Sequence, residues 1–367
     1  MPVQTRSERF TSTAHADFPE VTGREVNWKY TPVAKLGELI DGELDGSPYE
    51  IAYADAAGTT VEWVDRTHAL VGAAGIPEDR AAANAWTSFE KALHIRLEGD
   101  AEALTVVRST LGGTARAAHT IVSAAKGATG LVVLDSQGDA KLTENVEIVL
   151  EDDANVTVVS VQQWDDSALH LASQYARVGH GASLRHIVVS LGGDVVRVNP
   201  SAHLAEEGAE AELYGVYFAD AGQHLEQQVY VNHDAPHTRS RVTYKGALNG
   251  EGAHTVWIGD VLIGRDATGT DTYEQNRNLV LSDGTRADSI PNLEIETGDI
   301  EGAGHASATG RFDDEQLFYL QARGIPEDEA RRLVVLGFLS EVVQKIGEPV
   351  LEARLHEALE DELAAAR

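Results

Sequence analysis

The sequence predicts a mostly β protein, a solenoid of short stacked strands with helical segments at its ends. The first observation is a small turn ending in alanine that recurs through the middle of the chain. The second is that alternating or β-branched runs flank these turns, such as Ile148–Leu150 before one turn and Val156–Val159 after it. The third is a C-terminal stretch whose apolar residues have helical spacing. Repeats with short strands between regular turns are typical of a β-solenoid.

The turns recur in nearly constant phase. Successive turn alanines are separated by 26, 28, 27 and 26 residues: they are Ala128, Ala154, Ala182, Ala209 and Ala235. A single rung cannot bury its inner face, so neighbouring rungs must stack. A small residue at the turn lets successive backbones approach closely. An antiparallel sandwich with regular turns is the alternative, and the constant phase favours the solenoid.

We divide the chain into three regions. Residues 1–94 form a partly flexible, helical N-terminal region, residues 95–310 form the solenoid core, and residues 311–367 form a C-terminal helical domain. In the first region, Trp28–Pro32 is interpreted as an aromatic anchor. A helix is predicted to begin at Pro77, because proline suits the first helical position.

The C-terminal region is predicted to contain three helices. Asp313 and Gln316 have the spacing of a capping box at the start of the first, and Gly324 ends it. The second starts at Pro326. Its apolar face is expected to be formed by Ala330, Leu333, Val334, Gly337 and Phe338, extended by Val342 and Ile346.

Composition excludes several classes of function. The net charge is −30, from 59 acidic and 29 basic residues, so phosphate backbones and anionic membranes would repel the chain. We therefore expect no nucleic-acid or membrane partner. The chain has no cysteine, so it supplies no disulfide, thiolate ligand or thiol nucleophile. It has no secretory leader pattern and no apolar run of membrane-spanning length, which predicts a cytoplasmic protein.

No nucleotide-hydrolysis or hydrolase motif is present. The chain lacks a Walker-type Gly-Lys-Ser/Thr, a Gly-x-Ser-x-Gly elbow and a His-Glu-x-x-His helix. The acidic pairs Asp152–Asp153 and Glu206–Glu207 raise the alternative of a carbohydrate-cleaving solenoid enzyme. In a chain with 59 acidic residues, we interpret them instead as solvated turn charges.

The histidines are the remaining candidates for chemistry. His305 lies in a run of small residues, Gly302–Gly310, where nothing large hides an imidazole from a partner. A neutral imidazole is a good iron ligand. The others share no ligand spacing and are interpreted as solvated turn or sheet-face residues: His170, His180, His186, His203, His224, His233, His237 and His254.

Several segments resemble the SufB/SufD family of iron–sulfur cluster assembly proteins. The family's C-terminal signature is similar to Gly304–His305, Thr309–Leu320, Arg323–Ile325, Glu329–Leu333 and Gly337–Leu339. Its late rungs are similar to Asn276–Gly284 and Pro291–Ile295, and its N-terminal motif to Trp28–Pro32. The length and the missing cysteine favour the SufD branch over SufB.

The resemblance implies a right-handed parallel β-helix with helical ends and no catalysis of its own. It implies pairing with a SufB-like paralogue through the late rungs, with self-pairing as a homodimer when the chain is isolated. It also implies binding of a SufC-like ATPase through the C-terminal helices. The residues expected to make partner contacts are Asp314, Gln316, Leu317, Phe318, Tyr319, Arg323, Arg331, Leu333 and Phe338.

The resemblance also gives His305 a role. It falls where SufD proteins have a histidine proposed to hold the nascent cluster at the interface with SufB. Some SufD chains have a cysteine two residues earlier, where this chain has Ala303. The sulfur ligands would then come from SufB, with His305 as the nitrogen donor. The expected cofactor is a transient cluster or iron shared with SufB, and none bound tightly by this chain alone. A purely structural adaptor that only presents the ATPase-binding helices is a further alternative.

Overall fold

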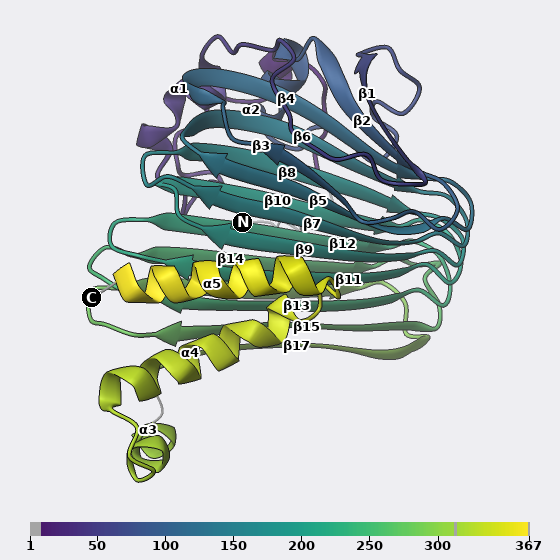
Figure 1. The fold of residues 1–367 in the computed structure, drawn as a ribbon. Helices are drawn as coiled ribbons and strands as arrows, with labels where there is room; N and C mark the ends of the chain where they lie inside the picture. Colours follow the sequence, from purple (N-terminus) through teal and green to yellow (C-terminus); the bar gives the residue numbers. More distant parts are fainter. Residues whose placement is uncertain (1–8, 312–313, 366–367) are drawn as a thin grey trace.

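The computed structural model describes residues 9–311 and 314–365 and confirms the predicted fold. Its strands wind into a parallel β-solenoid of about eight turns over the described residues (Figure 1). From β2 onward, consecutive strands alternate between two sheets, so each strand pairs with the strand two places along the chain. The rungs are parallel, and β1 and β2 are the one antiparallel pair among the described strands.

Within the described residues, the two sheets contain nine and eight strands. Sheet A is formed by β1 (Thr59–Asp65), β2 (Lys91–Leu97), β4 (Gly112–Ala124), β6 (Ala140–Leu150), β8 (Leu169–Val178), β10 (Val195–Leu204), β12 (His224–His233), β14 (His254–Ile263) and β16 (Arg286–Ile295). Sheet B is formed by β3 (Leu104–Arg108), β5 (Thr129–Gly138), β7 (Asn155–Trp164), β9 (Ser183–Leu191), β11 (Glu210–Ala219), β13 (Arg239–Leu248), β15 (Thr270–Val280) and β17 (Ile300–Arg311). The sequence analysis did not predict β1, which lies in the N-terminal region 1–94 that was expected to be helical and partly flexible.

The recurring turns join the two sheets at one corner of every rung. All five turn alanines are buried, as expected for residues stacked between rungs. The turns also bond to one another: the N–H of Gly181 donates to the carbonyl of Glu207 at 3.1 Å, and that of Gly208 to Pro236 at 3.1 Å. Both glycines have positive φ, +59° and +70°, a conformation that glycine adopts without strain.

The solenoid encloses an apolar lumen. Strand β7 shows how its sequence serves two layers, since Val156 and Val158 face the lumen core while Val159 and Val161 face the C-terminal helices. Both faces of sheet B are buried at β7. The strand therefore has a nearly continuous β-branched run and does not alternate between apolar and polar residues.

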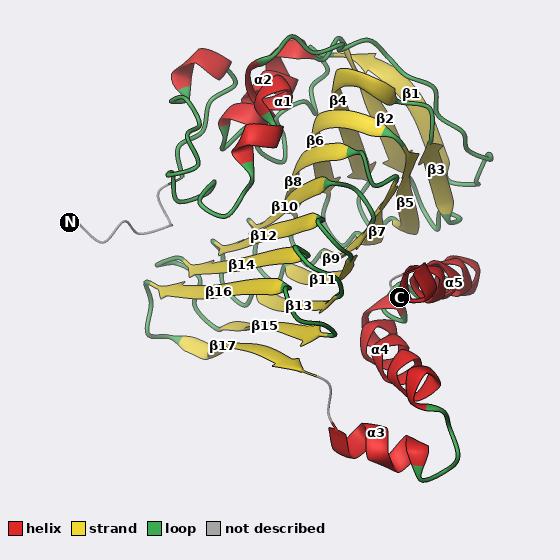
Figure 2. Ribbon diagram, turned by 90° about the vertical axis from the view of Figure 1, so that its left-hand side faces the viewer, coloured by secondary structure: helices red, strands yellow, loops and turns green. Residues whose placement is uncertain are grey.

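The N-terminal elements cover the outer face of sheet A (Figure 2). They are the short helices η1 (His15–Asp17), η2 (Val33–Lys35), α1 (Gly37–Asp41) and α2 (Arg80–Ser88). Helix α2 begins at Arg80 and not at Pro77, because the Asp79 carboxylate accepts from the N–H of Ala82 at 2.9 Å and caps the helix there.

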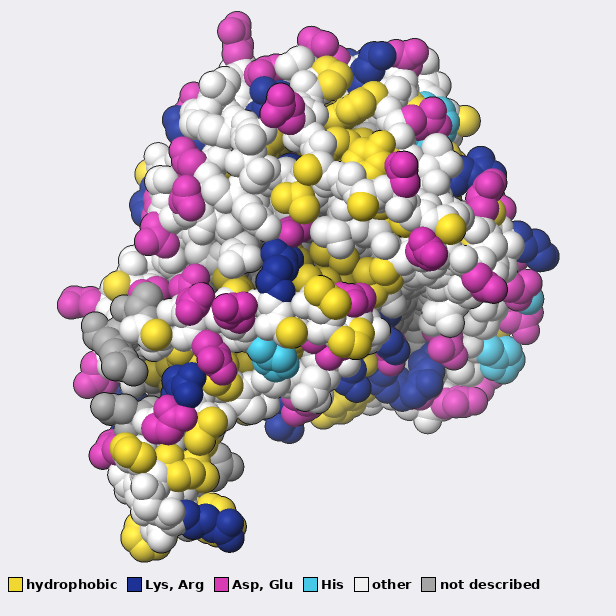
Figure 3. Space-filling model, viewed as in Figure 1, with side chains coloured by type: hydrophobic (Ala, Val, Ile, Leu, Met, Phe, Trp, Pro, Cys, Tyr) yellow, Lys and Arg dark blue, Asp and Glu magenta, His cyan; other side chains and the backbone are white. Residues whose placement is uncertain are grey.

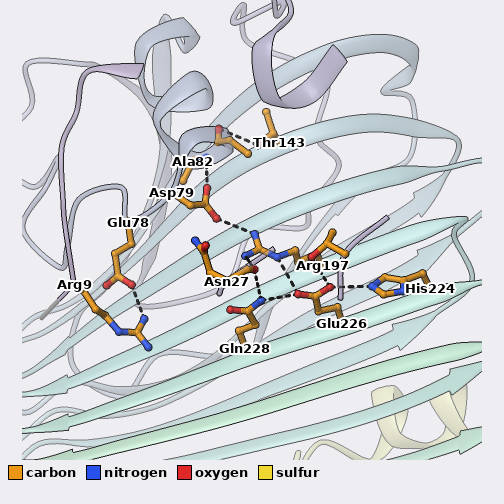
Figure 4. Close-up of polar contacts among 12 residues, drawn as sticks. Arg9, Asn27, Glu78, Asp79, Ala82, Thr143, Arg197, His224, Glu226 and Gln228 are labelled. Carbon is orange, nitrogen blue, oxygen red and sulfur yellow. Dashed lines mark hydrogen bonds and ion pairs between the residues drawn. The ribbon is translucent and has the colours of Figure 1, made fainter. Parts of the chain in front are cut away.

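A buried ion network fastens the N-terminal segment to sheet A (Figure 4). The Arg197 guanidinium donates to Asp79 at 2.8 Å, to Glu226 at 3.1 Å and to the carbonyl of Asn27 at 3.0 Å. It lies 4.1 Å from the centroid of the Trp28 ring, which is 2% exposed. The predicted aromatic anchor is therefore confirmed, and it packs against a buried cation.

The same network extends along sheet A. Burial disfavours the charged form of Glu226, but hydrogen bonding from His224 and the charge of Arg197 lower its pKa to about 2. The hydroxyl of Thr31 donates to Glu226 at 2.8 Å, so the N-terminal segment satisfies this carboxylate too.

The C-terminal region contains α3 (Asp314–Gln321), α4 (Glu327–Val343) and α5 (Pro349–Ala365). Helices α4 and α5 lie on the outer face of sheet B, whereas α3 projects beyond the last rung (Figures 1 and 2). The Lys245 ammonium donates to Glu341 at 2.5 Å, and Arg354 pairs with Asp135 at 2.9 Å, which ties both helices to the sheet. No helix within these described residues is long and apolar enough to cross a membrane.

Two details of the C-terminal prediction change. Ala330, Val342 and Ile346 are buried as expected, but the buried face of α4 also includes Val335, Leu339 and Val343, whereas Leu333, which was assigned to that face, is 41% exposed. Asp313, the expected N-cap residue of the first helix, lies outside the described residues.

Candidate functional site at the open end of the lumen

One column of inward-facing side chains runs through sheet B from the first rungs to the last. Strand pairing places its members in register: Val132, Val158, His186, Leu213, Val242, Glu274 and His305. The column is thus mainly apolar until its last two positions, where a carboxylate and an imidazole follow each other. This change marks the candidate site.

His305 lies on β17, the last strand of sheet B in the described residues. Its Nδ1 is 3.8 Å from Oε1 of Glu274 on β15, the rung beneath. The His305 side chain is 44% exposed, because among the described residues a rung covers it on one side only and the flanking residues are small. The predicted accessibility of this imidazole is confirmed.

Glu274 is the residue that the sequence analysis missed. Its side chain is 1% exposed, and neither carboxylate oxygen has a hydrogen-bond partner among the described residues. Burial, then the charge of Asp260, raise the pKa of Glu274 to about 8, while the backbone of Asn292 acts in the opposite direction. A glutamate at an inward position, where earlier rungs have valine or leucine, is the signal that could have revealed it.

Sheet A leaves room for this carboxylate. A Cβ on Gly259 of β14 would lie 2.4 Å from Oε2 of Glu274 and 2.3 Å from the ring of Trp257. These distances are too short for non-bonded atoms, so a larger residue at position 259 would displace the Glu274 carboxylate or the Trp257 ring. Gly259 and Trp257 therefore form the inner wall of the site.

Polar side chains continue beside the column. The Tyr217 hydroxyl donates to Asn278 at 2.7 Å and accepts from Asn276 at 2.7 Å. Ser289 of β16 donates to Asn276 and accepts from Asn278, at 2.6 Å and 3.0 Å. These amides are satisfied within the protein, which distinguishes them from Glu274.

The chemistry of His305 and Glu274 fits a metal shared with a partner. Imidazole nitrogen and carboxylate oxygen both suit iron. Within the described residues, no group of three or more histidine, aspartate or glutamate side chains is arranged to hold a metal ion. Two donors from this chain would leave the other coordination positions to ligands from elsewhere.

The structure corrects the interpretation of several other histidines. His170, His186 and His233 are at most 3% exposed and are not solvated. His170 bonds to Glu144 at 2.8 Å, and His233 bonds to Thr238 and Ser240 at 2.8 and 2.9 Å. These side chains belong to the interior of the solenoid.

The acidic pairs lie in the repeated turns. The side chains of Asp152 and Asp153 are 50% and 59% exposed and lie near Lys126, and Glu206 is 49% exposed and pairs with Arg177. The interpretation as solvated turn charges is confirmed for these three residues.

The expected partner-contact residues on the C-terminal helices fall into two groups. Phe318 and Tyr319 of α3 and Leu333 of α4 are 71%, 56% and 41% exposed, and Figure 3 shows hydrophobic side chains gathered over α3. The guanidinium of Arg323 lies 4.6 Å from the centre of the exposed Tyr319 ring.

The second group is engaged within the chain. Leu317 is 7% exposed, Phe338 packs near the Lys245 ammonium at 4.7 Å from its ring centre, and Arg331 pairs with Glu327 at 2.8 Å. The side chains of Asp314 and Gln316 lie outside the described part of the structure.

Comparison with known proteins gives one consistent result. Residues 107–338 match the family described as SUF system FeS cluster assembly, SufBD core domain. An iron–sulfur cluster assembly SufBD family protein of Mycobacterium tuberculosis is 47% identical over 369 residues, which cover 98% of this chain and 93% of that protein. One of Mycobacterium leprae is 47% identical, over 93% of this chain and 90% of that protein. A second SufBD family protein of M. tuberculosis is 30% identical over 55% of this chain and 24% of its own length.

Proposed function

Because the chain belongs to the SufBD family of iron–sulfur cluster assembly proteins, we propose that it is the SufD-type subunit of a SufBCD scaffold complex. In this proposal it pairs with a SufB-like paralogue, binds a SufC-like ATPase and helps iron acquisition and nascent cluster assembly. It carries out no catalysis itself. The absence of cysteine supports the SufD assignment. The sulfur ligands of the cluster then have to come from the paralogue.

The observation that carries the proposal is the position of His305. Its half-exposed imidazole lies on an edge strand at the open end of the lumen. Beneath it lies the Glu274 carboxylate, which has no hydrogen-bond partner among the described residues. A partner that docks on this edge would bring its own ligands next to the imidazole. His305 is then the nitrogen donor to a cluster held between two chains.

The late rungs are suited to pairing. Among the described residues, β16 and β17 are the last strands of their sheets, so one edge of each offers unpaired N–H and C=O groups. A SufB-like chain with a related solenoid could extend both sheets, and a second copy of this chain could do so when the partner is absent. Both M. tuberculosis and M. leprae have two SufBD family proteins similar to this chain, which supports a pair of paralogues.

The ATPase is assigned to the C-terminal helices. The exposed Phe318, Tyr319 and Leu333 offer apolar surface on α3 and α4, next to the last rung. A purely structural adaptor would use these helices and leave His305 without a role. The cytoplasmic location stays a prediction of the sequence.

The test is co-expression with the SufB-like and SufC-like proteins of the same genome. We expect a complex that binds an iron–sulfur cluster on anaerobic reconstitution, and we expect His305→Ala to lower its cluster or iron content at least ~10-fold, as for lost metal-site residues. The variant should keep its circular dichroism spectrum. Unchanged cluster content would remove the ligand role of His305 and favour the adaptor, and failure to form the complex would refute the proposal.

A second variant locates the ATPase contact. Truncation of residues 313–367 should abolish binding of the SufC-like protein while pairing with the SufB-like chain persists. Retained ATPase binding would place that contact on the solenoid instead.

A further inference from the structure

We infer that Glu274 is an iron-binding residue that forms, with His305, an oxygen–nitrogen half-site for ferrous iron at the open end of the lumen. The inference deepens the proposed function and rests on it, because it gives incoming iron a first position next to the cluster ligand.

The geometry of the two side chains permits a shared ion. Oε1 of Glu274 and Nδ1 of His305 are 3.8 Å apart, and two metal–donor bonds of about 2 Å each can span that distance. Both residues lie on adjacent rungs in register, so their separation is set by the β-sheet. A site built on two paired strands holds its donors more firmly than one built on a loop.

Glu274 differs from the other deeply buried glutamates. Three of them have cationic or imidazole partners: Glu144 bonds to Arg108 and His170, Glu147 to His119, and Glu226 to Arg197 and His224. Neither oxygen of Glu274 has a hydrogen-bond partner in the described structure. The charged form of a buried carboxylate that accepts no such hydrogen bond is unfavourable, and a bound cation would compensate its charge.

The neighbours of the carboxylate indicate the direction of access. Gly259 and Trp257 close the inner side of the carboxylate, and His305 lies between it and the edge of the last rung. An ion would therefore enter from the edge on which the partner is proposed to dock. Its remaining coordination positions would face that partner, from which the sulfur ligands are expected.

The test titrates Co²⁺, which prefers the same nitrogen and oxygen donors as ferrous iron, into the purified full-length chain. Binding is followed by d–d absorption and by the shift in thermal unfolding midpoint, since a ligand that binds the folded state stabilises it. The variant is Glu274→Gln, which keeps the shape and removes the anionic donor. The matched control is Glu301→Gln, which removes the same charge from an exposed position of β17.

We expect the wild type and Glu301→Gln to bind one Co²⁺ with affinities within about twofold of each other. Glu274→Gln and His305→Ala should each weaken binding at least ~10-fold and lose the Co²⁺-dependent thermal shift. Wild-type affinity in Glu274→Gln, or no binding by the wild type at millimolar Co²⁺, would overturn the inference.

Cluster content of the co-expressed complex is measured in parallel. If the wild-type complex assembles clusters and the Glu274→Gln chain binds Co²⁺ normally, the half-site is overturned and the proposed function stands. A complex without clusters would refute the proposed function. The half-site would still be supported if Glu274→Gln lost Co²⁺ binding and Glu301→Gln kept it.

Discussion

The two ends of one lumen column have different chemistry. In the first rungs of sheet B the column contains Val132 and Val158, both fully buried, whereas in the last two rungs it contains Glu274 and His305. The backbone is the same parallel ladder in both places. The two places differ in how the side chains are covered. A side chain in the middle of the column lies between two rungs, whereas among the described residues His305 has a rung on one side only.

This difference separates stability from binding within one fold. Apolar burial of about 1.5–3 kcal/mol per large side chain accumulates where rungs enclose the lumen. At the open end that contribution falls, and polar groups can reach water or a partner. The comparison predicts that substitutions of the same type will have large effects in the enclosed rungs and small effects at the open end.

The largest contrast is expected between two ion pairs. Arg197→Met leaves Asp79 and Glu226 buried without their cation, and it should lower the free energy of unfolding by ~3–5 kcal/mol. Arg311→Met removes a pair with Asp283 at the last rung, where the side chains are 76% and 87% exposed. This variant should change the free energy of unfolding by less than ~1 kcal/mol. Urea unfolding followed by tryptophan fluorescence measures both. Similar losses in the two variants would contradict the comparison.

A second contrast uses one residue type in register on neighbouring rungs of sheet A. Ile263 is fully buried, and its partner Ile295 on the last rung is 45% exposed. Ile263→Ala should destabilise the chain by ~2–5 kcal/mol through lost burial and a cavity. Ile295→Ala should remain below ~1 kcal/mol in the isolated chain. If Ile295→Ala were as costly as Ile263→Ala, the last rung would already be enclosed without a partner.

The regular part of the fold was predictable because its signals are local. The alanine turns recur with the rung, so their spacing alone indicates stacking, and the structure buries each of them. The buried face of α4 was less predictable, because apolar residues occupy two sides of that helix. Sheet B covers Val335 and Leu339, whereas Leu333 remains exposed, and the choice depends on how the helix docks.

The candidate site was half predictable. His305 was found because its small neighbours leave an imidazole exposed. Glu274 could not be separated from the many other acidic residues of the chain. What distinguishes it is a buried position with no hydrogen-bond partner among the described residues. That property depends on the register of β13, β15 and β17, which pairs residues 31 or 32 positions apart. The looser repeat after Ala235 hid this register.

The column also contains a histidine within its enclosed part, and this gives a pH test of the comparison. His186 is 3% exposed, neither ring nitrogen has a hydrogen-bond partner in the described structure, and burial lowers its pKa to about 4. An unfolded histidine has a pKa near ~6.5. Between these values the unfolded chain binds a proton that the folded chain does not, so the stability present above pH ~6.5 is lost as the pH falls toward ~4, by about 3 kcal/mol in total.

His186→Leu should remove this part of the acid sensitivity, because leucine has a similar volume and does not titrate. The side chains around position 186 include Ile148, Leu184 and Leu213, which suit an apolar replacement. Urea midpoints measured from pH 7 to pH 4 should therefore fall less steeply in His186→Leu than in the wild type, by up to about 3 kcal/mol at the acid end. His180→Leu is the control, because His180 lies exposed in a turn and is in water in both states. An unchanged acid slope in His186→Leu would mean that water or a proton reaches the middle of the lumen, and the contrast between an enclosed centre and an open end would fail.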